Sequence, residues 1–177
     1  MPKLHRSKKI MILKWLAQKK RSLPLSPKLF RPLVWLRGCL NGASLGVRLI
    51  VQDEFDRVLL VRHTYIKGWY LPGGAITPGE PPLEAAKREL FEETGVEAIS
   101  QPDLFGYYLN SRGFMRDYVS CYRIADWKAP DKLGPSDDGE IAETGFYAFS
   151  DLPDDVSPST RARVEELFGL RPLSDRW

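Results

Sequence analysis

Cysteine and histidine are scarce in this chain of 177 residues. It has two cysteines, Cys39 and Cys121, and two histidines, His5 and His63. The cysteines lack any metal-binding or redox spacing, which argues against a zinc site or a disulfide framework. We therefore expect both thiols to be small core groups in a reduced, cytoplasmic setting. His5 falls in a basic tail, and His63, at the end of an expected strand, is more typical of a structural than a catalytic histidine.

Long hydrophobic runs are also lacking. The apolar stretch at residues 10–16 is too short to cross a bilayer, and the stretch at residues 33–51 is interrupted by Arg37 and Arg48. No small-residue cleavage site follows an uncharged apolar segment, so a secretory signal is not predicted. The sequence therefore gives no support for a membrane-spanning or secreted protein.

Acidic residues are missing from the first 52 positions, which carry twelve Lys or Arg. Residues 53–177 carry fourteen Lys or Arg against twenty-three acids, a formal charge of −9. This asymmetry predicts a basic N-terminal extension, residues 1–40, and one catalytic domain, residues 41–177. Four roles stay open for the extension: an organelle transit peptide, a membrane-surface helix, a nucleic-acid or phosphate-attracting arm, and a solvated segment without a separate role. No feature of the sequence fixes an oligomeric state.

Glutamate is dense in one segment, residues 74–96. Its sequence, GAITPGEPPLEAAKRELFEETGV, fills every position of the spacing G-x5-E-x7-R-E-U-x-E-E-x-G-U, where U is aliphatic. At average residue usage, a match this complete arises by chance in roughly one in 10⁹ windows. The fixed positions are Gly74, Glu80, Arg88, Glu89, Leu90, Glu92, Glu93, Gly95 and Val96.

Residues 81–94 of this segment are predicted to form a helix. Pro81 suits the first helical position, because its missing N–H has no intrahelical partner there in any case. Gly95 supplies the residue that ends the helix. Leu83, Ala86 and Leu90 share one stripe of the helix surface, which we expect to pack on the core.

The glutamates occupy a neighbouring arc of that helix. Glu89, Glu92 and Glu93 repel one another at these spacings, and a divalent cation would remove the conflict. Carboxylate oxygens suit Mg²⁺ or Mn²⁺, and the lack of nearby cysteine or histidine argues against zinc. Arg88 lies one turn before Glu92 and can orient a carboxylate, with Glu80 in the preceding loop as a second partner.

The segment resembles the Nudix box, the signature of Mg²⁺-dependent hydrolases that cut a diphosphate linked to another group. The resemblance covers about residues 44–170 and implies an α/β fold, a Nudix-like α/β/α sandwich with a mixed β-sheet. It implies that the metals, Mg²⁺ or Mn²⁺, are held by the Gly74 carbonyl and by the helix glutamates. The general base varies within the family. We favour Glu89 and Glu93 as metal ligands and Glu92 as ligand or base, and we count Glu93, Arg88 and Glu80 among the catalytic positions.

A looser likeness to the family follows at residues 140–153. Family members often place a metal-binding or base carboxylate in the loop before a strand, which we expect here at residues 145–149. Glu140 is the favoured carboxylate, with Asp137 and Asp138 as substitutes. The alternative is an ordinary acidic loop.

Candidate substrate-binding residues flank the box. Tyr65 and Trp69 could stack a base, and Arg112 could hold a phosphate. Further candidates of the same kinds are Tyr70, Lys67 and Arg116. The alternative is that the aromatic residues belong to the core.

The sequence thus predicts a Mg²⁺-dependent Nudix pyrophosphohydrolase acting on a nucleotide or a nucleoside-diphosphate derivative. A second hypothesis is an RNA 5′-end pyrophosphohydrolase, with the basic extension attracting the nucleic acid. A third is a non-catalytic nucleotide-binding regulator on the same fold. The complete set of box glutamates argues against the third hypothesis, since a binding module has no need of a metal triad.

Overall fold

The computed structural model describes residues 43–112, 115–134 and 139–177. Its first sheet has the strand order β1-β6-β5, formed by β1 (Ser44–Val51), β6 (Met115–Ile124) and β5 (Asp103–Arg112). Strand β1 runs parallel to β6, whereas β5 runs antiparallel to it. The sheet is therefore mixed, as the family resemblance implied.

The second sheet is antiparallel, with the strand order β3-β2-β8. It contains β3 (Trp69–Tyr70), β2 (Val58–His63) and β8 (Ile141–Tyr147). A two-stranded sheet pairs β4 (Glu97–Ala98) with β7 (Trp127–Lys128). Strand β7 belongs to residues 126–139, whose content of proline, glycine and aspartate is otherwise typical of an irregular loop.

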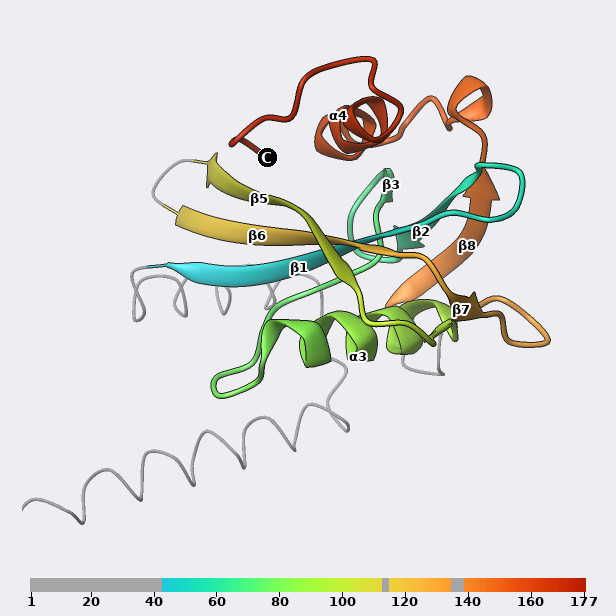
Figure 1. Ribbon diagram of the computed structural model, residues 1–177, viewed down its shortest axis with the longest axis horizontal. Helices are drawn as coiled ribbons and strands as arrows, with labels where there is room; N and C mark the ends of the chain where they lie inside the picture. The colour runs from blue at the N-terminus through green and yellow to red at the C-terminus, as the bar shows by residue number, and fades with distance from the viewer. Residues whose placement is uncertain (1–42, 113–114, 135–138) are drawn as a thin grey trace, which may run out of the picture. The chain divides into compact units, whose positions relative to one another are not determined.

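Two helices lie on opposite sides of the strands (Figure 1). Helix α3 (Pro82–Thr94) and helix α4 (Pro158–Leu167) each cover a separate hydrophobic core, and a short 3₁₀ helix, η2 (Phe149–Asp151), precedes α4. Burial on both faces explains why β1 is almost continuously apolar near its end, where Val47, Leu49, Ile50 and Val51 are fully buried. The α/β/α arrangement predicted from the sequence is confirmed.

Helix α3 carries the box and largely follows its prediction. Ala86 and Leu90 are buried in the core, and Leu83 packs partly buried against it. Gly95 ends the helix in the left-handed conformation, φ 73°. The start lies one residue later than expected, because Pro81 is the extended capping residue and the helix begins at the next proline.

Several expected boundaries were wrong. The turn at residues 53–57 is present, but β1 and β2 enter different sheets and share only one isolated bridge, between Gln52 and Val58. Residues 110–113 have the composition of a turn, yet β5 continues to Arg112, and β8 begins at Ile141 rather than near residue 145. Pairing with the next strand, β6, extends β5, and pairing with the distant β2 extends β8, each beyond its local signal.

Cys121 is a buried free thiol, as expected, and its burial raises its pKa to about 12. Cys39 and the N-terminal extension lie outside the described residues, as do Asp137 and Asp138. Within the described ranges, none of the helices combines the length and apolar character that crossing a membrane requires.

Candidate active site

Two glycines shape the loop that leads into the box. Gly73 has φ 134°, and a side chain there would overlap the Val47 carbonyl oxygen of β1. The Gly74 carbonyl accepts a hydrogen bond of 2.9 Å from the Val47 N–H, which fixes the loop along that strand. A Cβ atom at Gly74 would overlap the Glu89 carboxylate. The missing side chain therefore lets the Glu89 carboxylate lie against the loop backbone.

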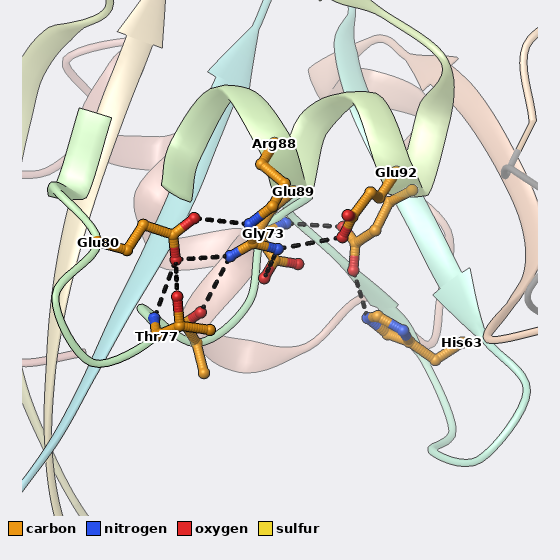
Figure 2. A network of polar contacts seen from close by, with 9 residues as sticks. His63, Gly73, Thr77, Glu80, Arg88, Glu89 and Glu92 are labelled. Atoms are coloured by element: carbon orange, nitrogen blue, oxygen red, sulfur yellow. Dashed lines mark hydrogen bonds and ion pairs between the residues drawn. The ribbon is translucent and has the colours of Figure 1, made fainter. Parts of the chain in front are cut away.

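Arg88 is the hub of a polar network on the exposed side of α3 (Figure 2). Its guanidinium grips Glu80 with two hydrogen bonds, from Nε (2.7 Å) and Nη2 (3.0 Å). Nη1 donates to Glu89 (2.8 Å) and to Glu92 (3.1 Å). The pairing of Arg88 with Glu80, expected from the spacing, is therefore present, and Arg88 also gathers two of the helix glutamates.

Glu80 is held as a carboxylate by this network. It accepts hydrogen bonds from Arg88 and from the Thr77 backbone N–H and hydroxyl. The Arg88 hydrogen bond is the largest cause of a pKa lowered to about 2. The same bonds hold the pKa of Arg88 above its usual value. Glu80 thus fixes Arg88 in position.

Glu93 lies on the inner side of the helix, where its side chain is 12% exposed. Its Oε2 accepts a hydrogen bond of 2.7 Å from the Gly73 N–H, and its Oε1 lies 3.9 Å from His63 Nε2. Burial raises the pKa of Glu93 to about 8. Burial also lowers the pKa of His63 to about 4, with a smaller contribution from the positive charge of Arg48. Near pH 7 His63 is therefore neutral and offers Glu93 no full positive charge.

The three helix glutamates differ in exposure. The Glu89 side chain is 15% exposed, and burial raises its pKa against the opposing effect of Arg88. The Glu92 side chain is 47% exposed and stands at the solvent side of the network. The helix therefore presents two enclosed carboxylates and one open carboxylate.

These residues fit a hard divalent cation, although no three acidic, histidine or cysteine side chains of the described ranges already converge as a ligand set. Gly74 leaves room for the Glu89 carboxylate beside its own backbone, and its carbonyl keeps a second lone pair beyond the Val47 hydrogen bond. The enclosed carboxylate of Glu93 would be stabilised in its charged form by a cation. Oxygen donors of this kind suit Mg²⁺ or Mn²⁺.

Two candidate residues outside helix α3, Glu140 and Tyr65, interact electrostatically with Glu93 of that helix. The charge of Glu140, which directly precedes β8, raises the pKa of both Glu93 and Tyr65. Backbone and side-chain bonds from Thr64 hold the backbone of Glu140, with Thr64 N donating to its carbonyl at 2.9 Å. Tyr65 is 39% exposed, and its ring centroid lies 5.1 Å from that of His63.

Trp69, a further candidate, lies elsewhere. It is only 7% exposed, and its ring packs edge-on against Tyr147 in the core, so it has no open face for a base. Arg112 is the last residue of β5, and its side chain lies outside the part of the chain that the structure describes. Trp69 is thus a core residue, the alternative weighed for the aromatic residues.

Two residues were missed or undervalued by sequence reasoning, Arg48 and His63. Arg48 stands in the middle of the apolar strand β1, and its charge acts on Glu89, Glu93 and Tyr65. The signal was available in the sequence: a lone arginine in a strand that is apolar on both faces is costly unless it has an anionic neighbour. The identity of that neighbour depends on the fold.

The fold and this site together define an α/β protein with an acidic centre suited to a divalent metal. A family model described as NUDIX domain matches residues 43–167. The chain is 32% identical over 160 residues to the RNA pyrophosphohydrolase of Mesorhizobium japonicum, covering 78% of this chain and 87% of that protein. It is 33% identical over 124 residues to the m7GpppN-mRNA hydrolase dcap-2 of Caenorhabditis elegans, covering 66% of this chain but only 15% of that protein.

Solved structures agree on the fold. A MutT NUDIX hydrolase from Burkholderia pseudomallei matches with a TM-score of 0.62 and 21% identity, covering 71% of this chain and 98% of that one. The chain belongs to the Nudix family, and it is a hydrolase that acts on diphosphate bonds.

Proposed function

We propose that the protein is a Mg²⁺-dependent pyrophosphohydrolase whose substrate is a nucleoside-linked diphosphate. The observation that carries the proposal is the enclosed pair Glu89 and Glu93 beside the Gly73-Gly74 backbone. Both carboxyl groups have raised pKa values because they are buried. A divalent cation would offset that cost, and it would draw a phosphate-bearing substrate into an otherwise acidic site.

The chain's own residues would then divide the work. Glu89, Glu93 and the Gly74 carbonyl would hold a cation, which would neutralise negative charge on the phosphates. Glu92, open to solvent, would accept a proton from a water that attacks one phosphorus of the diphosphate. The bridging P–O bond then breaks, and the other phosphate leaves with its electron pair. Arg88, fixed by Glu80, keeps Glu89 and Glu92 at a set distance from each other. Glu140, directly before β8, would add a further carboxylate near Glu93.

A second candidate substrate is a 5′-triphosphorylated RNA end. It is favoured by the twelve basic residues and no acids among the first 52 positions, which suit a polyanion. The relative from Mesorhizobium japonicum carries the name RNA pyrophosphohydrolase, which supports RNA as a candidate substrate here. We propose a cytoplasmic location for either activity.

The test is phosphate and pyrophosphate release from a substrate panel. The panel contains nucleoside triphosphates, dinucleoside polyphosphates, nucleotide sugars and 5′-triphosphate RNA, each with Mg²⁺, with Mn²⁺ and with a chelator. We expect metal-dependent release from at least one compound. A protein that releases nothing from any compound, yet binds nucleotides, would instead be the non-catalytic regulator.

Replacing Glu93 tests the site directly. Glu93→Gln keeps the shape of the side chain but removes its charge, so we expect turnover to fall at least about 100-fold, the scale on which removal of one key electrostatic group acts. The matched control is Glu84→Gln, the same change at an exposed position of the same helix. Circular dichroism should show both variants folded. Turnover of Glu93→Gln equal to that of the control would refute the assignment.

A further inference from the structure

Two buried nitrogen atoms near Glu93 have no hydrogen-bond partner in the described part of the chain. They are Nη1 of Arg48, on β1, and Nδ1 of His63, at the end of β2. His63 is 8% exposed. A buried donor without a partner is costly, so such atoms call for an explanation. Two of them beside one reaction centre indicate a ligand.

The setting of Arg48 is unusual for a guanidinium. Arg48 is the register partner of the buried Cys121 on β6, so its side chain leaves the sheet on the same apolar face as the Cys121 side chain. The residue as a whole is only partly buried. Its Cα lies 3.0 Å from the position that a Cβ of Gly73 would take, and the Gly73 N–H binds Glu93, so Arg48 stands beside the loop of the same centre. Its charge acts on Glu89, Glu93, His63 and Tyr65 accordingly.

The carboxylates around Arg48 are directed to other donors. Glu93 accepts from the Gly73 N–H, and Glu89 accepts from Arg88. Arginine stays charged at any pH at which the protein is folded, so it cannot escape the cost of burial by losing a proton. A bound metal cation would be repelled by it. An anion would satisfy Arg48, and the anion that this centre processes is a phosphate.

Aromatic rings line the same place. The His63 ring lies 5.1 Å from the Tyr65 ring and 5.7 Å from the Tyr70 ring, centroid to centroid. The unpartnered Nδ1 of His63 would add a second donor beside Arg48 in the tautomer that carries its proton there. Planar guanidinium donors match the oxygens of a phosphate in pairs.

We propose that Arg48, flanked by His63 and Tyr65, is the substrate-binding residue that holds a phosphate of the diphosphate next to the metal-binding glutamates. This inference rests on the proposed function, since it names a phosphoanhydride as the ligand of the same centre. It assigns to β1 a role in recognition that is separate from the metal-binding role of α3.

The test measures binding of imidodiphosphate, a phosphoanhydride analogue with a nitrogen bridge, by calorimetry in the presence of Mn²⁺. We expect Arg48→Gln to weaken binding about 10-fold to 100-fold, the range for loss of a charged hydrogen bond. Arg48→Lys keeps the charge without the paired donors, so its affinity for imidodiphosphate should fall between that of wild type and that of Arg48→Gln. Arg123→Gln, at an exposed position on β6, is the matched control and should bind like wild type.

A second measurement separates substrate binding from support of the carboxylates. Mn²⁺ binding alone, followed by electron paramagnetic resonance, should not weaken in Arg48→Gln, because the ligands remain and a repelling charge is gone. In the turnover assay the KM should rise more than kcat falls. Wild-type affinity for imidodiphosphate in Arg48→Gln, or loss of Mn²⁺ binding together with the analogue, would overturn the inference. If Arg48→Gln does not fold, the affinity of Arg48→Lys decides, and a wild-type value overturns it.

The binding assay needs no turnover, so the two proposals fail separately. A protein that hydrolyses nothing in the panel but binds imidodiphosphate through Arg48 loses the proposed function and keeps this site. A protein that hydrolyses a substrate with unchanged KM in Arg48→Gln keeps the function and loses this site. A protein that neither hydrolyses nor binds loses both.

Discussion

At the residue scale, Glu93 Oε1 and His63 Nε2 lie 3.9 Å apart. The pKa of Glu93 is raised and the pKa of His63 is lowered, yet both shifts favour the neutral form of the side chain. The common cause is burial, which disfavours charge on an acid and on a base alike. The metal-free protein therefore holds an uncharged pair at its centre near pH 7. Binding a cation would change the charge state of that pair, so metal binding and proton release are coupled.

This coupling predicts how stability depends on pH. The pKa of Glu93 rises from 4.5 when unfolded to about 8 when folded without metal, so stability falls as the pH rises through that interval. His63 acts in the opposite sense below its unfolded value of 6.5, which leaves the window from pH 6.5 to 8 for Glu93. In a chelator, the free energy of unfolding should decline there by at most about 1.4 kcal/mol per pH unit. Urea unfolding at several pH values measures this slope.

Two comparisons check the cause of the slope. The Gln side chain of Glu93→Gln cannot ionise, so the stability of this variant should decline less steeply with pH. The remaining decline would come from Glu89, whose pKa is also raised by folding. Saturating Mg²⁺ should flatten the decline, because metal binds the charged form. A wild-type slope that survives in Glu93→Gln would contradict the attribution.

Gly74 provides a second prediction at the residue scale. Its backbone is not in the left-handed region, so Gly74→Ala adds a methyl group without backbone strain, but that group meets the Glu89 carboxylate. We expect a loss of turnover of about tenfold or more, the effect of misplacing a catalytic group by about 1 Å, with little change in stability.

Gly79→Ala, in the same loop, is the matched control for Gly74→Ala. Gly79 has φ 87°, and nothing lies within 4 Å of an added Cβ, so this change strains the backbone but leaves Glu89 untouched. Its stability should fall by about 1–3 kcal/mol, while turnover per folded molecule stays the same. Thermal melts and turnover assays of both variants give the comparison. Equal turnover in the two variants would remove the argument from the Glu89 contact.

At the element scale, the helices could be predicted from the sequence and the strand partners could not. Helix α3 is specified by nearby residues, a proline at its start, Gly95 at its end and one apolar stripe. Strand β1 instead pairs with β6, more than sixty residues along the chain, and the short turn after β1 would suggest β2 as its partner. Strand pairing depends on tertiary packing, which no local pattern contains.

The site divides along the same line. The box residues could be placed because they lie on one helix and one loop, where spacing fixes geometry. Arg48, in the middle of β1, and His63, at the end of β2, belong to different sheets, and no local spacing relates either of them to Glu93. Trp69, close to the box in sequence, points into the core instead. Distance along the chain was therefore a poor guide to everything outside the box.

The cap of helix α4 gives a prediction at this scale. The Ser157 hydroxyl accepts a hydrogen bond of 3.1 Å from the Thr160 N–H, and Pro158 follows it, a pattern typical of a helix start. Ser157→Ala should lower the free energy of unfolding by about 1 kcal/mol. The control is Ser159→Ala in the same turn, whose hydroxyl does not cap the helix and whose change should cost less. Urea unfolding compares them, and equal costs would argue against the cap as the cause.

At the scale of the whole molecule, the uneven charge distribution decides which polyanions the protein attracts. The described body is acidic, and its reaction centre is acidic too, so long-range attraction of RNA must come from the first 52 residues, with their twelve basic side chains. A mononucleotide needs only the centre, whereas an RNA also meets the extension. Salt dependence can therefore separate the two candidate substrates.

The prediction compares two triple variants in RNA binding. Each basic contact with a phosphate of single-stranded RNA adds about 0.7 to the slope of log K against log salt concentration. Neutralising three basic residues of the extension should therefore reduce the slope by up to about 2, and the same change on the body should leave it nearly unchanged. The first variant carries Lys19→Gln, Lys20→Gln and Arg21→Gln. The control carries Arg123→Gln, Lys128→Gln and Lys132→Gln, and these three control positions are exposed. Fluorescence anisotropy with 5′-triphosphate RNA at 50–300 mM KCl, a range spanning about one Debye-length halving, gives both slopes. A slope equally shallow in wild type and both variants would contradict a role of the extension in RNA attraction and favour the small nucleotide as substrate.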